Sequence, residues 1–425
     1  MTRERVVLAA CAAVIVASMV CIGLLPSPRT HVAAFLLLYV AGFAAYALAA
    51  RAILRSRRTD TRLPLAVLAV SALAHAALIP ARPDLSPDIY RYAWEGRVFL
   101  EGHNPFALAP DDSALVHLRD ADFARVTYAG LTTIYPPLAQ GVFALAALIH
   151  PGPAMLKVFF SLFNLGTVLV LFRLLRRRGR PTAHALVFAW NPLVLVETGH
   201  SGHVDAMAAF FLVLAIDLWE SDRRVWSGIV MGASALVKYL AAAALPWFAR
   251  RRHLAIAAVV VLVVAAGYAP FWSAGAHLFS SLRAYAGNWW FNGPPFLALS
   301  GFLGNQDVAR RLLVAGGIAF AMAAAYRERD LARYLFLVIG CVLLVSPTVY
   351  PWYMMSMMPL LALFPHRAWI AFSALVMLSY GVWRVYNVSG AWLLPTWLMA
   401  LEYVPFYALL LLGLARTNQR VRVSA

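Results

Sequence analysis

The sequence predicts an all-α protein that crosses a membrane many times. Hydrophobic residues make up 62% of the 425-residue chain, whereas charged residues make up only 13%. Apolar runs of about 18 residues or more recur along the chain, and a helix of that length spans roughly 30 Å of hydrocarbon. The net charge of +17 comes from arginines in short clusters between these runs, as is typical of cytoplasmic loops. A nucleic-acid partner is therefore not expected.

Residues 1–80 are expected to form three spans. A basic start precedes the first, residues 6–25, and without a small-residue cleavage pattern before Pro26 we expect this span to be retained. The second, residues 31–49, is followed by a cluster of arginines that predicts a cytoplasmic loop. This cluster consists of Arg51, Arg55, Arg57, Arg58 and Arg62. The third span, residues 63–79, then delivers the chain to the outer face.

Residues 81–153 form an acidic segment that we expect on the outer face. Eight of the chain's nineteen carboxylates lie between residues 81 and 134. The apolar stretch 136–149 is short, and stretches of that length are more often interfacial than spanning. An interfacial helix there also keeps the arginines at 173–180 in the cytoplasm. The sequence therefore predicts a large outer loop carrying short interfacial helices.

Residues 154–425 are expected to complete a single integral bundle with short outer loops. Spans are predicted near 154–172, 183–198, 204–219, 225–248, 254–272, 309–325, 332–346, 353–365, 368–384 and 398–414. Basic clusters flank the segment 225–248 at both ends, which predicts two short helices that meet near Lys238. The total is about eleven to thirteen spans.

Asp88 is the leading catalytic candidate. Ser86-Pro87-Asp88 is typical of a helix start, and at helical spacing Asp88, Tyr92 and Glu95 share a face with Arg91 beside them. The alternative is that Asp88 only stabilises the helix terminus. The helix dipole would favour its anion, which makes a carboxylate in the first turn a weaker base.

Further ionisable residues lie between short apolar runs. The stretch NPLVLVETGHSGHVD contains His200, His203 and Asp205, whose spacing is compatible with zinc but is more commonly used for hydrogen bonds at helix ends. Lys238 is a candidate for neutralising a phosphate, or it extends its amine to the membrane interface.

Two outer-face stretches have alternative interpretations. The aromatic and amide-rich residues 283–292 suit sugar stacking, yet tryptophans at a membrane boundary also form the ordinary aromatic belt. Asp111 and Asp112 are candidates for holding a divalent cation, but two adjacent carboxylates without further ligands favour a solvated loop tip. Tyr350 lies in an outer turn that could help to close a substrate cavity.

Several motifs together resemble a known superfamily. In order, they are DIYRYAWEGRVFLEGHNPF, YPPLAQ, NPLVLVETGHSGHVDA, GASALVKYLAAAALP and SPTVYPWY. This series is similar to the polytopic glycosyltransferases of the GT-C superfamily, particularly the bacterial polyprenol-phosphate-mannose-dependent mannosyltransferases. The resemblance covers most of residues 84–353 and leaves residues 1–62 unaccounted for.

The resemblance implies a GT-C-like bundle at the cytoplasmic membrane that transfers a hexose, most often mannose. The donor would be a polyprenyl-phosphate sugar and the acceptor a lipid or glycan at the outer face, with membrane lipids as the surroundings. Asp88 matches the catalytic acid position, with Asp84 as the second candidate. The expected substrate-binding residues are Arg91, Tyr92, Glu95, His200, His203, Asp205, Lys238 and Tyr350. A divalent cation is an open cofactor candidate, and a transporter or a non-catalytic scaffold is the alternative function.

Overall fold

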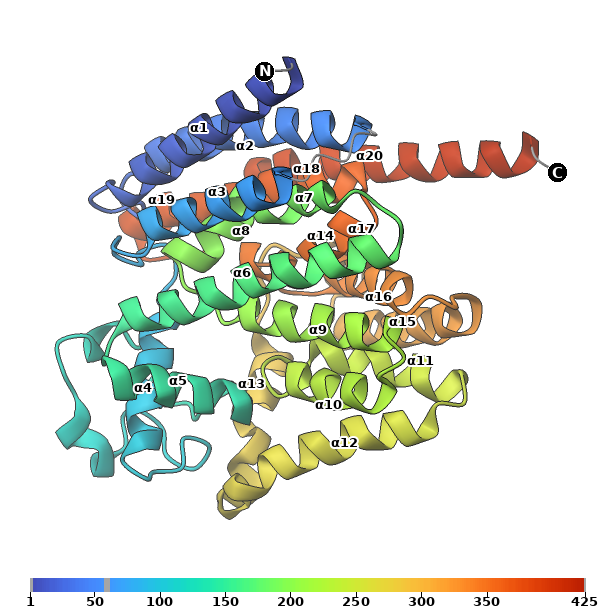
Figure 1. The fold of residues 1–425 in the computed structure, drawn as a ribbon. Helices are drawn as coiled ribbons and strands as arrows, with labels where there is room; N and C mark the ends of the chain where they lie inside the picture. Colours follow the sequence, from blue (N-terminus) through green and yellow to red (C-terminus); the bar gives the residue numbers. More distant parts are fainter. Residues whose placement is uncertain (1–2, 57–61, 424–425) are drawn as a thin grey trace.

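The computed structural model describes residues 3–56 and 62–423, and in this part of the chain the regular elements are all helical. Arg57 and Arg58 of the predicted cytoplasmic cluster lie outside the described residues. Seven helical segments are long and apolar enough to cross a membrane. They are α1 (Arg3–Gly23), α2 (Val32–Arg55), α6 (Pro153–Arg177), the run Leu254–Asn288, α15 (Gln306–Arg327), the run Arg367–Ser389 and α20 (Thr396–Val423). The predicted all-α polytopic membrane fold is thus confirmed (Figure 1).

Several other predicted spans consist of short helices rather than one long helix. Four apolar helices have only 10–17 residues each: α3 (Leu63–Leu78), α5 (Pro137–Ile149), α14 (Pro294–Leu303) and α16 (Leu331–Val345). Helix α9 spans Asp205–Glu220. The predicted span 183–198 is divided into η3 (Thr182–Ala185), α7 (Leu186–Ala189), α8 (Pro192–Leu195) and the π-helical η4 (Val196–His200). Similarly, 353–365 becomes η7 (Pro351–Ser356) and α17 (Met358–Leu363). These pieces are largely buried, and protein burial is what makes irregular backbone tolerable at membrane depth.

The predicted break near Lys238 is confirmed. Helix α10 (Arg224–Ala235) ends there, Lys238 is extended (φ −151°, ψ 131°), and the chain continues as η5 (Tyr239–Ala244) and α11 (Leu245–Arg250). The break exposes the carbonyl of Leu236, which accepts hydrogen bonds from Leu138 N (3.0 Å) and Ala139 N (3.3 Å) at the start of α5. A carbonyl left unpaired at the end of α10 therefore accepts hydrogen bonds from amide groups at the start of α5, which have no partner within their own helix.

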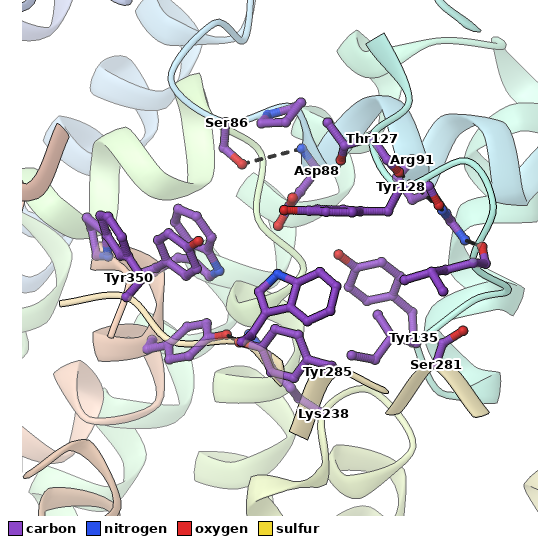
Figure 2. A pocket seen from close by; sticks show the side chains of 18 of the residues that line it. Ser86, Asp88, Arg91, Thr127, Tyr128, Tyr135, Lys238, Ser281, Tyr285 and Tyr350 are labelled. Atoms are coloured by element: carbon purple, nitrogen blue, oxygen red, sulfur yellow. Dashed lines mark hydrogen bonds between the residues drawn. The ribbon is translucent and has the colours of Figure 1, made fainter. Parts of the chain in front are cut away.

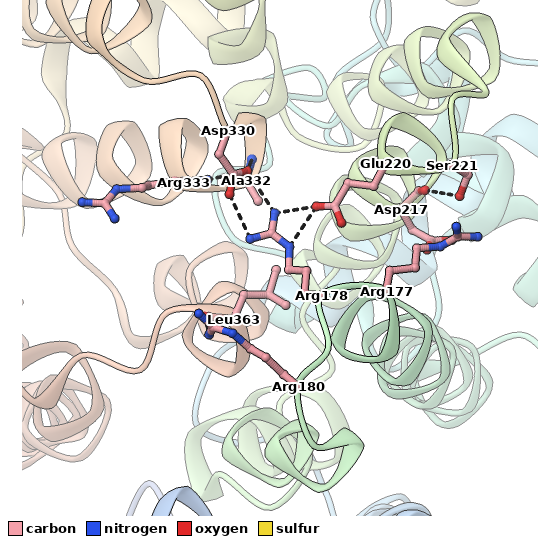
Figure 3. A network of polar contacts seen from close by, with 10 residues as sticks. All are labelled: Arg177, Arg178, Arg180, Asp217, Glu220, Ser221, Asp330, Ala332, Arg333 and Leu363. Carbon is pink, nitrogen blue, oxygen red and sulfur yellow. Dashed lines mark hydrogen bonds and ion pairs between the residues drawn. The ribbon is translucent and has the colours of Figure 1, made fainter.

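Helix α4 (Asp88–Leu100) and helix α5 lie together at one end of the bundle, within the acidic segment (Figure 1). A Cβ on Gly96 would lie 2.4 Å from the carbonyl oxygen of Phe143, so only glycine permits this approach of α4 to α5. Two 3-10 turns, η1 (Ser113–Leu118) and η2 (Phe123–Arg125), complete the segment. From its end, α6 runs along the bundle to a cluster of ion pairs around Arg178 (Figure 3).

The segment between residues 269 and 303 differs from the prediction, which placed no helix there after residue 272. Helix α12 (Leu254–Tyr268) continues through η6 (Ala269–Phe279), bends at Gly275 (φ 54°) and leads into α13 (Ser280–Asn288). A non-helical stretch, residues 289–293, follows and pairs with residues 347–349 through Phe291 N to Pro347 O (2.9 Å) and Val349 N to Phe291 O (2.8 Å). Two segments distant in sequence are thereby joined side by side. The run Arg367–Ser389 is likewise made of α18 (Arg367–Leu375), η8 (Val376–Gly381) and α19 (Val382–Ser389).

Candidate active site

A cavity of about 400 Å³ lies where the acidic segment meets the bundle (Figure 2). Its walls come from the start of α4, the return segment 127–136, the break at Lys238, helix α13, the turn before η7 and helix α19. Most lining side chains are aromatic or aliphatic, and the charged ones are Asp88, Arg91 and Lys238. Concave, largely apolar sites with a few convergent polar groups are the usual form of a small-molecule binding site.

Asp88 is the first residue of α4, and its carboxylate points into this cavity (Figure 2). Pro87 precedes it at the helix start, and Ser86 Oγ accepts a hydrogen bond from Asp88 N at 3.3 Å. Among the residues whose side chains the structure describes (4–56 and 62–415), none forms a hydrogen bond or ion pair with the Asp88 carboxylate. An acidic group that faces a cavity without a protein partner is available to a ligand.

The surroundings raise the pKa of Asp88 above its ordinary value, chiefly because burial disfavours the charged form. The positive charges of His203, Lys238 and Arg91 oppose this effect, whereas the nearby Asp205 adds to it. The expectation that the helix start would make Asp88 a weaker base is therefore wrong. Burial is the largest cause of the shift, and a raised pKa makes the anion a better proton acceptor.

Lys238 brings a cation to the same cavity. Its Nζ donates to Asp205 Oδ1 and lies 4.7 Å from the centre of the Tyr353 ring. Asp205 is the first residue of α9 and is buried, whereas the Lys238 side chain keeps 29% of its surface exposed. The break between α10 and η5 thus places an ammonium group on the cavity wall and holds it from behind through Asp205.

His203 is held behind the wall. Its Nδ1 lies 2.8 Å from Glu197 Oε2, and Glu197 also accepts a hydrogen bond from Tyr380 OH at 2.9 Å. The imidazole stacks on Trp352 with 4.0 Å between ring centres. His200 is fully buried and does not line the cavity. The described residues contain no group of three or more His, Cys, Asp or Glu side chains placed to hold a metal ion.

Stacked aromatic rings form another wall. Tyr350 lies between Phe291 and Trp352, with centroid distances of 4.7 Å and 4.5 Å. Tyr350 therefore lines the cavity, and Tyr285 and Trp289 from the predicted aromatic stretch join it there. Phe291 of the same stretch also lines the cavity, whereas Arg283, Trp290 and Asn292 do not; Arg283 and Trp290 are exposed, and Asn292 is buried.

Three residues expected to bind substrate have mainly structural contacts. Arg91 lines the cavity, but its guanidinium donates to Glu95 Oε1 (2.5 Å), Leu131 O (2.6 Å) and Tyr128 O (3.1 Å). Glu95 is buried and also accepts from Thr133 Oγ1 (2.6 Å) and Gln140 Nε2 (2.7 Å). Such a network fixes the return segment against α4.

Tyr92 is packed between the rings of Tyr135 and Phe143, each 4.7 Å away, and is 1% exposed. Neither Tyr92 nor Glu95 lines the cavity. Helical spacing correctly places them beside Arg91, but the face that they share is turned into the packing between α4 and α5.

The remaining acidic candidates lie away from the cavity. Asp84 forms an ion pair with Arg82 (3.1 Å), and Asp112 caps the turn η1 by accepting from Ala114 N at 2.9 Å. Asp111 is exposed on the loop. None of the three lines the cavity.

The model of glycosyltransferase family 87 matches residues 133–347, half of the 425-residue chain. The chain belongs to glycosyltransferase family 87. Neither the search of curated proteins nor that of solved structures gave a match. Family membership and the multiple apolar helices identify a membrane-embedded glycosyltransferase.

The family 87 region supplies only part of the cavity. Lys238, Asp205 and His203 lie within the matched residues, whereas Asp88 precedes them and Tyr350 follows them. Cavity residues beyond the match that sequence reasoning missed are Ser86, Tyr380, Trp383, Tyr386 and Trp392. Tyr380 and Trp383 lie within the predicted span 368–384, and Tyr386 and Trp392 follow it. That segment has the pattern of an ordinary apolar span, so the sequence did not indicate that these residues belong to a site.

Proposed function

We propose that this family 87 protein transfers a hexose, by resemblance mannose, from a polyprenyl-phosphate donor to a lipid or glycan acceptor. The reaction would take place at the outer face of the cytoplasmic membrane. The observation that carries the proposal is the pairing, in one cavity, of a carboxylate without a protein partner and an ammonium group. These are the two charges that a displacement at a sugar phosphate requires.

In the proposed reaction, Asp88 acts as the general base. The acceptor hydroxyl oxygen attacks the anomeric carbon of the donor sugar, and its proton passes to the Asp88 carboxylate. The bond between the anomeric carbon and the phosphate oxygen breaks, and the polyprenyl phosphate leaves with the electron pair. The raised pKa of Asp88 supports this role, because a base is most effective when its pKa approaches the working pH.

Lys238 would stabilise the departing phosphate. Charge grows on the leaving oxygen as the bond breaks, and a cation held in advance stabilises that charge without reorganisation. Asp205 and the Tyr353 ring fix the ammonium group before substrate arrives. Asp205 and His203 therefore act as positioning residues in this scheme, since neither lines the cavity.

The form of the cavity supports a lipid-linked donor. Its walls are mostly apolar and aromatic, and the chain that encloses it is itself a membrane bundle. A polyprenyl phosphate is confined to the membrane and could approach such a site laterally, with the sugar and phosphate at the charged groups. Membership in a glycosyltransferase family favours this function over the transporter and scaffold alternatives.

A transfer assay with purified wild-type protein tests the proposal. Labelled polyprenyl-phosphate mannose, its glucose counterpart and a nucleotide sugar would be supplied separately with membrane lipids as acceptors. We expect labelled product from a polyprenyl-phosphate donor only. Transfer solely from the nucleotide sugar, or no transfer by folded protein, would refute the proposed donor. Repeating the assay with EDTA tests whether a divalent cation takes part.

A further inference from the structure

Two aromatic rings from different segments meet at the rim of the cavity. Tyr128 of the return segment contacts Trp289, the residue that follows α13, with 4.9 Å between ring centroids and an interplanar angle of 68°. Both residues line the cavity, and Figure 2 shows Tyr128 there. Tyr128 is nevertheless 61% exposed, and Trp289 is half-buried. A residue that lines a cavity and is also exposed lies at its opening, so this pair separates the interior of the cavity from its surroundings.

The backbone at Tyr128 is unfavourable for a large side chain. Its φ is 51°, in the left-handed region that bulky residues rarely occupy and that glycine adopts freely. The Tyr128 carbonyl accepts a hydrogen bond from Leu131 N at 2.9 Å, which closes a tight turn. Glycine would form this turn with less strain, so the turn does not account for the tyrosine. Strained residues of this kind cluster at active sites, where the surrounding structure holds them in place.

Arg91 fixes the backbone of this turn. Its guanidinium donates to the carbonyls of Thr127 (3.3 Å), Tyr128 (3.1 Å) and Leu131 (2.6 Å). Its Nε donates to Glu95 Oε1 at 2.5 Å, so the arginine is itself held by a carboxylate one turn further along α4. Arg91 is only 7% exposed. A buried arginine whose donors go to the backbone of a turn positions that turn, and Arg91 thereby determines where the Tyr128 ring lies.

Trp289 is fixed in the same way from another helix. Arg310 of α15 donates through Nη1 to the carbonyls of Ala286 (2.7 Å) and Trp289 (3.1 Å). The Trp289 amide donates to Tyr285 O at 3.1 Å. Both sides of the pair therefore have backbone carbonyls bound by an arginine from a neighbouring helix, α4 on one side and α15 on the other. An aromatic contact supported on both sides is more than an ordinary aromatic belt requires, since members of a belt need only face the membrane boundary.

The pair also lies near the reactive part of the cavity. Arg91 follows Asp88 by three residues on α4, and both line the cavity. The helix that presents the carboxylate thus also fixes the turn that presents the Tyr128 ring. On another wall, burial raises the pKa of Tyr350, and the nearby phenols of Tyr285 and Tyr128 add to that effect. Tyr128 therefore lies near both the helix of Asp88 and the aromatic wall.

We propose that Tyr128 and Trp289 form an aromatic clamp that covers the donor sugar in the cavity and keeps water away from it. Tyr128 is then a specificity-determining residue, because it decides whether the sugar passes to the acceptor or to water. Arg91 is the positioning residue of the clamp. The inference rests on the proposed function, in which Asp88 is the general base.

Hydrolysis of the donor is the reaction that such a clamp suppresses. In this reaction the water oxygen attacks the anomeric carbon, and a proton of the water passes to the Asp88 carboxylate. The bond between the anomeric carbon and the phosphate oxygen breaks, and the polyprenyl phosphate leaves with the electron pair. A base that activates an acceptor hydroxyl activates water in the same way, so transfer is favoured only where water is excluded.

The partition of the sugar between the two products tests the clamp. Purified full-length protein is given labelled polyprenyl-phosphate mannose and membrane lipids, and the transfer product and the free labelled sugar are measured separately. Tyr128→Gly suits the left-handed backbone and removes the ring. We expect it to raise the ratio of free sugar to transfer product about tenfold over wild type, the scale of discrimination by a single side-chain contact. Trp289→Ala should raise the same ratio. A variant with a damaged fold would instead lower both products together.

Three further variants control this measurement. Ala129→Gly places a glycine in the same turn but leaves the ring, so its ratio should equal that of wild type. Trp290→Ala removes an exposed neighbour of Trp289 that does not line the cavity, and its ratio should also stay unchanged. Tyr128→Phe restores the ring and should bring the ratio back towards that of wild type.

The outcomes separate this inference from the proposed function. If the donor is consumed but Tyr128→Gly and Trp289→Ala keep the wild-type ratio, the clamp is overturned and the proposed function stands. An equal rise in Ala129→Gly would also overturn the clamp, because the stiffness of the turn would then matter rather than the ring. If folded wild type consumes no polyprenyl-phosphate donor, the proposed function fails and this inference fails with it.

Discussion

The cavity and the ion-pair cluster around Arg178 use charge in opposite ways. At the carboxyl-terminal end of α6, Arg178 contacts Asp330 through Nη1 (2.9 Å) and Glu220 through Nε (3.0 Å), as Figure 3 shows. Asp217 is likewise shared between Arg173 (2.6 Å) and Arg177 (3.2 Å). In the cavity, the Asp88 carboxylate has no hydrogen-bond or ion-pair partner among the described side chains (Figure 2). The charges of the Arg178 cluster are thus paired within the protein, whereas the Asp88 carboxylate is not.

This difference separates structural charges from functional ones. Asp330 caps α16 and Glu220 belongs to the last turn of α9, so Arg178 ties the ends of three helices together. A charge that is removed from water without a partner costs free energy, and a chain keeps such a group where a ligand completes it. Substitutions at the two ends of α6 should therefore affect different measurements.

Asp88→Asn is expected to have the largest effect on catalysis. Loss of the proton acceptor should lower kcat by about a hundredfold to ten-thousandfold while the melting temperature changes little, because the carboxylate has no hydrogen-bond or ion-pair partner among the described side chains. Asp84→Asn is the matched control, since Asp84 contacts Arg82 outside the cavity. Radiolabel transfer measures both variants. Equal losses in the two, or full activity of Asp88→Asn, would assign the base elsewhere.

Lys238→Gln should have the next largest effect. Removing the cation should lower kcat on the order of tenfold to a hundredfold, less than the loss of a fully enclosed donor because the side chain is partly exposed. This change also leaves Asp205 unpaired, which could by itself disturb the cavity.

The double variant Lys238→Gln/Asp205→Asn separates these two causes. If Lys238 acts on the phosphate, the double variant stays as slow as the single one. Recovery of activity in the double variant would instead show that the unpaired Asp205 caused the loss.

Arg178→Ala, at the carboxyl-terminal end of α6, should affect stability rather than catalysis. Its removal leaves Glu220 and Asp330 without their shared partner, which should lower the free energy of unfolding by about 1–3 kcal/mol. The turnover of protein that remains folded should be unchanged. Thermal unfolding in detergent, followed by transfer at a temperature below the transition, provides both readouts. A kcat loss without a stability loss would contradict the division between the two ends.

Sequence reasoning predicted the fold class, the acidic segment and the break at Lys238, because each leaves a local pattern. Three patterns can be read from the sequence without knowledge of tertiary contacts. They are the length of the apolar runs, the concentration of carboxylates in residues 81–134, and the basic residues on both sides of the segment 225–248. The break shows this most clearly, since clusters at 222–224 and 250–252 cannot both end a single crossing on the cytoplasmic side.

The missed parts of the site depend on contacts across the chain. Trp383 lies 298 residues from Leu85, whose carbonyl it binds, and Tyr380 lies 183 residues from Glu197. The position of Glu95 depends on such contacts too. Its spacing puts it beside Arg91, which lines the cavity, but the Glu95 carboxylate accepts hydrogen bonds from Thr133 and Gln140 and does not line the cavity.

The smallest expected effect is a shift in the pH dependence of transfer, and it gives the sharpest test of the role of Asp88. A general base must be deprotonated, so kcat/KM should rise with pH through the pKa of Asp88. Because burial raises that pKa, the rise should lie above the ordinary aspartate range near about 4. His203, Lys238 and Arg91 lower this pKa through their positive charges, and Asp205 raises it. Lys238→Gln removes one of the lowering charges, so its residual activity should rise at a higher pH than that of wild type. Arg178→Ala, at the far end of α6, should leave the profile in place. A shift of the Lys238→Gln profile to lower pH would show that Asp88 is not the titrating group, because loss of a positive charge cannot ease the ionisation of a nearby carboxyl group.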